Sequence, residues 1–150
     1  ARHLESSEDK FLRALALSHL INIYIKEFTG RLSSICGCSV AAGSGAAAAM
    51  TYLLGGDLGA IEAAITNVVA NLAGMVCDGG KLSCALKLCT GAVTAWWSAL
   101  LALEGLKVPA GNGIVGETVE KTIANLGYLT NEGMESVDRS IISILGMTPC

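Results

Sequence analysis

The feature that most constrains the fold is a run of small side chains between residues 39 and 54. It reads Ser-Val-Ala-Ala-Gly-Ser-Gly-Ala-Ala-Ala-Ala-Met-Thr-Tyr-Leu-Leu. Side chains this small cannot fill the space around a helix, so other helices or a ligand must contact its backbone directly. The run therefore predicts a helix at the centre of a bundle, more deeply buried than its neighbours.

Five further helices are expected around this central one, because apolar residues recur at helical spacing between recognisable start and stop residues. Ser6 or Ser7 is expected to cap the first helix and Gly30 to end it, while Asp57 caps the helix that follows the central one. The expected ranges are 7–28, 57–75, 81–103, 117–126 and 131–145. No strand pattern is present, so the predicted fold is all-α, a compact bundle of about six helices in one domain covering 1–150.

The composition excludes some classes of partner. Hydrophobic residues make up 52% of the chain, charged residues 15%, and the net charge is −3 with no basic cluster, which argues against nucleic acid. The apolar runs 40–54 and 88–103 are shorter than the roughly 20 residues that a membrane span needs, and Gly, Ser or Thr interrupts both. We therefore expect buried helices rather than a membrane protein, and a cytoplasmic location, since the first residues fit no targeting signal.

Two pairs of cysteines stand next to glycine turns. Residues 74–84 read Gly-Met-Val-Cys-Asp-Gly-Gly-Lys-Leu-Ser-Cys, which predicts a helix end, a tight turn and a helix start with Cys77 and Cys84 on either side. Cys36 and Cys38 precede the central helix. If the two helix starts meet, three or four thiolates converge where backbone amides and helix dipoles favour negative charge. Long apolar helices are unlike a disulfide scaffold, so the cysteines are expected to be reduced.

Spacing alone leaves the metal undecided. The Cys-x-Cys and Cys-x6-Cys patterns fit neither a zinc ribbon nor the common ferredoxin runs. Cys89 lies about 140° around the helix from Cys84 and is expected to point elsewhere. Asn67 and Asn71 share a helix face near the turn, where they either bond neighbouring helix ends or bind a polar ligand.

Several segments together resemble the serine dehydratase alpha-chain domain, in its L-cysteine desulfidase-like branch. They are Thr29-Gly-Arg-Leu-Ser, Cys36-Gly-Cys-Ser-Val-Ala-Ala-Gly, Leu54-Gly-Gly and the run from Asn71 to Lys87. The resemblance implies a [4Fe-4S] cluster held by three cysteines with one iron left open. By position these are Cys36, Cys77 and Cys84, with Cys38 as an open alternative to Cys36. Protein handled in air can lack such a cluster.

The resemblance also implies an activity, which is β-elimination from L-cysteine or L-serine without pyridoxal phosphate. The open iron would act as a Lewis acid on the thiol or hydroxyl while a base removes the α-proton, and the aminoacrylate would hydrolyse to pyruvate and ammonia. Lys81, Asn71, Asp78 and Arg31 flank the proposed ligands and are expected to line one pocket. Lys81 or Arg31 would bind the substrate carboxylate, and Gly79 and Gly80 would contact the cofactor through their amides.

The family's chains are much longer, so this chain is expected to be the cluster-binding domain from the C-terminal part of a larger protein, incomplete as an enzyme alone. Its expected partners are a small amino-acid substrate and a missing N-terminal segment or companion domain, with a homo-oligomer left open. The rival hypothesis is a non-catalytic helical interaction module whose cysteines are only small buried residues. Cys150 is either an unanchored chain end or a fourth ligand that swings onto the open iron.

Overall fold

The structure is a computed structural model that describes residues 6–146. It contains six α-helices and one short π-helix: α1 (Glu8–Thr29), α2 (Ala41–Leu53), α3 (Leu58–Leu72), α4 (Ser83–Leu103), α5 (Val119–Tyr128), the π-helix η2 (Leu129–Gly133) and α6 (Glu135–Ile144). Within residues 6–146 the extended backbone pairing is limited to one isolated bridge, so the all-α prediction is confirmed. Cys150 lies outside the described residues.

The helix ends follow local chemistry. The amide of Lys10 donates to the Ser7 hydroxyl and the amide of Ala60 donates to the Asp57 carboxylate, which confirms both predicted caps. Gly30 ends α1 with a φ of 82°, a backbone conformation that a residue with a Cβ rarely adopts.

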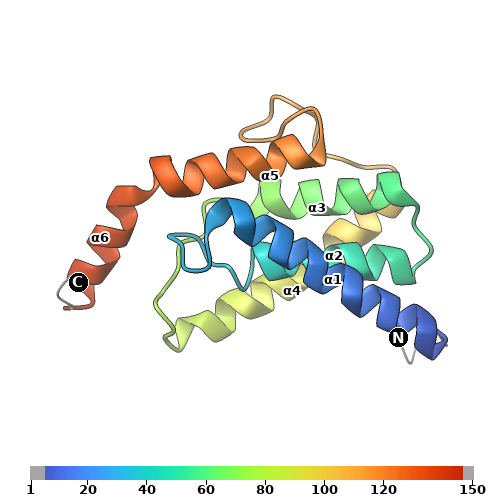
Figure 1. Cartoon of the computed structure of the whole chain (residues 1–150), viewed down its shortest axis with the longest axis horizontal. Helices are drawn as coiled ribbons and strands as arrows, with labels where there is room; N and C mark the ends of the chain where they lie inside the picture. The colour runs from blue at the N-terminus through green and yellow to red at the C-terminus, as the bar shows by residue number, and fades with distance from the viewer. Residues whose placement is uncertain (1–5, 147–150) are drawn as a thin grey trace.

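The helix α2 is the centre of the bundle, as its small residues predict. It is the one helix among residues 6–146 in which no residue is exposed. A Cβ added at Gly45 would lie 2.3 Å from the backbone oxygen of Ser18 on α1, and one added at Gly43 would lie 3.5 Å from the backbone oxygen of Gly91 on α4. Neighbouring helices therefore contact the α2 backbone directly, and α1, α3 and α4 surround it (Figure 1).

The C-terminal helices differ from the prediction. The fifth helix extends to Tyr128 and continues through η2, whereas the sequence predicted an end at residue 126. Gly127 therefore lies inside α5 and does not end it. A Cβ at this position would come 2.8 Å from the Phe28 side chain, so the absence of a side chain permits close packing of α5 on the end of α1. Figure 1 shows α5 and α6 extending toward one end of the long axis, opposite the start of α1.

The length argument against a membrane span does not hold for α4. With 21 residues and an 18-residue window of mean hydropathy 1.4, it is the one helix in the described part of the chain that could cross a membrane by length and composition. Of that window, 33% is buried inside the structure. A core helix passes the same test, and the inner face of α4 packs in the bundle: a Cβ added at Gly91 would lie 2.8 Å from the Cα of Ser39.

Candidate metal centre

A single antiparallel bridge joins the two cysteine-bearing segments. Ile35 pairs with Val76, the amide of Cys36 donates to the Met75 carbonyl at 2.7 Å, and the amide of Cys77 donates to the Ser34 carbonyl at 2.8 Å. The predicted approach of these two segments, which are about forty residues apart in the sequence, is therefore present in the structure.

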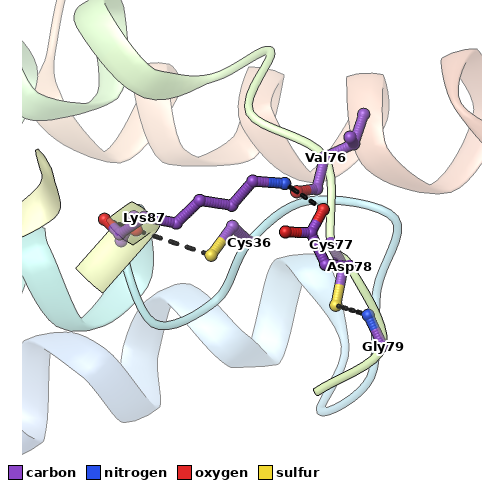
Figure 2. A network of polar contacts seen from close by, with 7 residues as sticks. Cys36, Val76, Cys77, Asp78, Gly79 and Lys87 are labelled. Carbon is purple, nitrogen blue, oxygen red and sulfur yellow. Dashed lines mark hydrogen bonds and ion pairs between the residues drawn. The ribbon is translucent and has the colours of Figure 1, made fainter. Parts of the chain in front are cut away.

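The bridge sets the relative position of the two cysteines. Cys36 and Cys77 each follow a bridged residue, and side chains alternate along extended backbone, so both point to the same side. Figure 2 shows both sulfur atoms on the side opposite the Val76 side chain. The two residues are diagonal neighbours in the pairing, for which the Cα atoms typically lie roughly 7–8 Å apart.

Lys87 joins the two segments to α4. Its ammonium donates to the Val76 carbonyl at 2.6 Å and forms an ion pair with Asp78, while its backbone carbonyl accepts a 2.6 Å hydrogen bond from the Ser39 hydroxyl. The Cys36 thiol donates to that same hydroxyl at 3.4 Å (Figure 2). We call Cys36, Ser39, Asp78 and Lys87 the Lys87 network.

The ion pair determines the charge state of Asp78. The Lys87 ammonium, assisted by the Ser83 hydroxyl and opposed by partial desolvation, holds the pKa of the Asp78 carboxyl below its usual value of 3.8. One carboxylate oxygen, Oδ2, is buried and has no hydrogen-bond partner in the described structure. Asp78 is therefore an anion at neutral pH that depends on Lys87 for compensation.

The Gly-Gly turn presents an amide to sulfur. Gly79 has a φ of 66° and Gly80 a φ of 76°, so both occupy the left-handed region that favours glycine. The Gly79 amide donates to the Cys77 sulfur at 3.4 Å (Figure 2). Cys84 follows in the first turn of α4, half-buried and three residues before Lys87, hence on the same side of the helix.

A cavity of about 450 Å³ opens beside the Cys77 segment. Arg31, Cys38, Cys77 and Gly79 line it together with Lys26, and α6 closes one side with Ile141, Ile142 and Leu145. A volume of this size is typical of small-molecule pockets. Of the predicted site residues, Arg31, Cys77 and Gly79 therefore share one cavity, and Cys38 rather than the buried Cys36 faces it.

Other predicted residues lie elsewhere. Asn71 lines a different hollow, between α3, α4 and the segment after α4, and Lys81 is exposed at the turn. Asn67 donates to the Leu106 carbonyl and accepts from the Val108 amide, both at 2.9 Å, so it holds the segment that follows α4. Of the two hypotheses for Asn67, the bond to a neighbouring helix end is the one that the structure shows.

The cysteine side chains do not form a ready metal site in the ligand-free geometry. Within residues 6–146, no three Cys, His, Asp or Glu side chains are grouped closely enough to hold a metal ion, and the five described cysteines are free thiols. The backbone brings the Cys36 and Cys77 segments together, while the sulfur atoms of Cys36 and Cys77 bond to Ser39 and Gly79.

Sequence reasoning missed Lys87 and Ser39. Lys87 is the only charged residue in the 21 residues of α4, and a lone charge in an apolar helix is a signal that could have indicated a buried partner. Ser39 gave no such signal, because it belongs to a run of small residues whose packing role alone explains it.

Comparison with known proteins identifies related chains. A family model described as serine dehydratase alpha chain matches residues 1–143. A UPF0597 protein of Desulfatibacillum aliphaticivorans is 52% identical over 144 residues, which cover 96% of this chain and 33% of the relative. A UPF0597 protein of Clostridium tetani is 48% identical over 142 residues, covering 95% of this chain and 34% of the relative. A UPF0597 protein of Parabacteroides distasonis is 48% identical over 150 residues, which cover 100% of this chain and 35% of the relative.

This chain thus spans about one third of the length of the curated relatives it matches. No solved structure matches it.

Proposed function

This chain belongs to the serine dehydratase alpha chain family, and on that premise we propose that it is the cluster-binding part of a lyase. The reaction is β-elimination from L-cysteine or L-serine, with pyruvate, ammonia and either sulfide or water as products. The observation that carries the proposal is the Ile35–Val76 bridge, which puts Cys36 and Cys77 on one side of a short paired segment.

The donor set fits an iron–sulfur cluster. Cys36 belongs to the Lys87 network, Cys77 directly precedes Asp78, and Cys84 lies one turn before Lys87 on α4. Cys38 lines the neighbouring cavity together with Cys77, and Cys89 lies exposed on α4. Cysteine thiolates are the usual ligands of iron–sulfur clusters, and Cys38 is the alternative to Cys36.

The chemistry that a bound [4Fe-4S] cluster supplies is Lewis acidity at an iron without a protein ligand. In the elimination itself the α-proton leaves to a base, the Cα–Cβ double bond forms from that electron pair, and the β-substituent departs with the electrons of its own bond. Hydrolysis of the resulting enamine, through its imine, gives pyruvate and ammonia.

The residues of this chain have three roles in the proposal. Arg31 lines the cavity beside Cys77 and binds the substrate carboxylate through its guanidinium, and it is favoured over Lys81 because Lys81 does not line that cavity. The Gly79 amide stabilises negative charge on the Cys77 sulfur. The Lys87–Asp78 pair keeps the Cys77 segment against α4. A cytoplasmic location is part of this proposal, in keeping with the metabolic chemistry of the family.

In this proposal the 150 residues are not a complete enzyme, in keeping with relatives that are about three times as long. We call the part of a longer relative that lies outside the matched third the companion portion. The test is pyruvate formation from L-cysteine and from L-serine, after anaerobic co-production of this chain with the companion portion of the Desulfatibacillum aliphaticivorans relative.

Parent protein should form pyruvate, and Cys77→Ser and Cys84→Ser should lower kcat/KM by at least about 100-fold, since each removes a ligand. Cys89→Ser is the matched control and should retain parental activity. A cluster-loaded parent that forms no pyruvate from either amino acid would contradict the lyase proposal and favour an interaction module.

A further inference from the structure

The outer face of α4 is an apolar stripe that nothing in the described chain covers. Leu86, Val93, Trp97 and Leu101 are 74%, 51%, 59% and 41% exposed. Their spacing of seven, four and four residues puts them on one side of the helix. We call these four residues the outer stripe; Cys89 and Trp96 lie beside it and are also exposed.

The outer stripe contains no charge. The one charged side chain of α4, Lys87, lies about 100° around the helix from Leu86 and bonds to Asp78. Thr90 stands between the stripe residues, but its hydroxyl donates to the Leu86 carbonyl of the same helix at 3.1 Å. A continuous uncharged stripe of this kind is typical of a surface that another part of a protein covers.

A hollow of about 570 Å³ adjoins the stripe. Trp97 and Leu101 form one side of it, and Asn71, Asn112 and Lys107 supply polar groups around it. The outer stripe supplies an apolar centre and the hollow supplies polar groups beside it, which is the usual composition of a protein interface.

The inner face of α4 limits what can cover the outer one. Gly91, Thr94, Ala95, Ser98 and Ala102 are buried against the bundle, and Gly91 packs on the backbone of Ser39. The helix therefore stays in the bundle while its outer stripe is covered. A lipid bilayer could surround α4 only if these contacts were lost.

We propose that the outer stripe of α4, with the adjoining hollow, is the docking surface for the companion portion. About two thirds of the length of each relative lies outside the matched third, and the outer stripe is a surface that no part of the described chain covers. The docking depends on apolar contact, so it requires neither a cluster nor catalytic activity.

The experiment co-produces this chain with the tagged companion portion of the Desulfatibacillum aliphaticivorans relative. Complex mass is measured by size exclusion with light scattering, and Kd by titration. Parent chain should form a one-to-one complex. Val93→Ser and Trp97→Ser should each weaken binding about 30-fold or more, as expected for apolar anchors at an interface centre. Leu20→Ser on α1, where Leu20 is 63% exposed, is the control and should bind like the parent.

A second measurement needs no substitution. Cys89 is exposed beside the stripe, so its alkylation by iodoacetamide, followed by peptide mass spectrometry, should slow at least about tenfold when the companion portion binds. Circular dichroism verifies that the variants keep the parental helix content.

The proposal would be overturned if the parent chain formed no complex with the companion portion, or if Leu20→Ser weakened binding as much as Val93→Ser and Trp97→Ser do. It would also be overturned if the outer stripe instead mediated a dimer of this chain that excludes the companion portion, or binding to phosphatidylglycerol vesicles. The docking proposal is judged by binding and alkylation, so it can be tested even if the lyase assay shows no activity. If docking fails, the cluster assignment is still tested separately by the iron and sulfide content.

Discussion

At the residue scale, Lys87 has the most connections in the candidate site. Its ammonium contacts the segment of Cys77, and its carbonyl contacts Ser39 beside Cys36. Both of these anchored segments must keep their places if two cysteines are to share one metal centre. The Lys87–Asp78 pair is only partly exposed, with 21% and 19% of the two side chains accessible, so solvent screens it less than a surface pair.

This pair predicts a specific pH dependence of stability. Because Lys87 lowers the pKa of Asp78 in the folded state, the pair stabilises the fold fully above the unfolded-state pKa, near 3.8. That stabilisation is lost as pH falls through the lower folded value. Urea unfolding from neutral pH down to about pH 3 should therefore show a smaller acid loss in Asp78→Asn than in the parent, with the variant less stable at neutral pH.

Lys87→Met is the companion variant for the same experiment. It leaves the Asp78 carboxylate without its cation, so the neutral-pH stability should fall and the acid loss should shrink as well. If Asp78→Asn and the parent lose stability in parallel as the pH falls, the ion pair does not have the role described here.

At the element scale, the small residues of α2 made the centre of the fold predictable. Side chains as small as those of alanine, glycine and serine cannot fill the space around a helix, so other helices or a ligand must contact its backbone, and in the structure α1, α3 and α4 are its neighbours. The caps at Ser7 and Asp57 and the helix end at Gly30 were predictable for a different reason, because each follows from the local chemistry of one residue. The role of Gly127 could not be predicted, because a glycine that ends a helix and one that permits packing on Phe28 look alike in sequence.

Gly45→Ala tests the packing of α2. The new Cβ would lie 2.3 Å from the backbone oxygen of Ser18, which cannot move aside as a side-chain end can. We expect a loss of about 1–3 kcal/mol or more in the free energy of unfolding, the usual cost of overpacking. Urea unfolding measures it.

Gly74→Ala is the matched control, since no atom lies within 4 Å of its added Cβ. It should change stability by less than about 1 kcal/mol. Equal losses in the two variants would show that contact with α1 is not what requires glycine at position 45.

At the scale of the whole molecule, the sequence predicted which segments meet but not how their side chains are arranged. The glycine turns and their cysteines indicated that the Cys36 and Cys77 segments converge. In the structure the antiparallel bridge between Ile35 and Val76 joins these two segments. The division between cavities was not predictable, because it depends on how the segment after α4 and helix α6 pack. Asn71 consequently lines one hollow and Arg31 another.

The unpaired outer stripe of α4 belongs to the same scale. The high apolar content, 52% of the chain, indicated either deep burial or a covered surface. In the structure α2 has no exposed residue, while α4 buries one side and exposes the other. Composition could not assign these outcomes to particular helices, because α2 and α4 have similar apolar content.

The measurement that tests the account most directly is the iron and acid-labile sulfide content of anaerobically reconstituted protein, co-produced with the companion portion. A [4Fe-4S] cluster predicts about four irons and four sulfides per chain in the parent and in Cys89→Ser. Cys36→Ser, Cys77→Ser and Cys84→Ser should each bind less than about half as much, and Cys38→Ser tests the alternative ligand. Parental iron content in Cys77→Ser and Cys84→Ser would contradict the assignment of the metal centre.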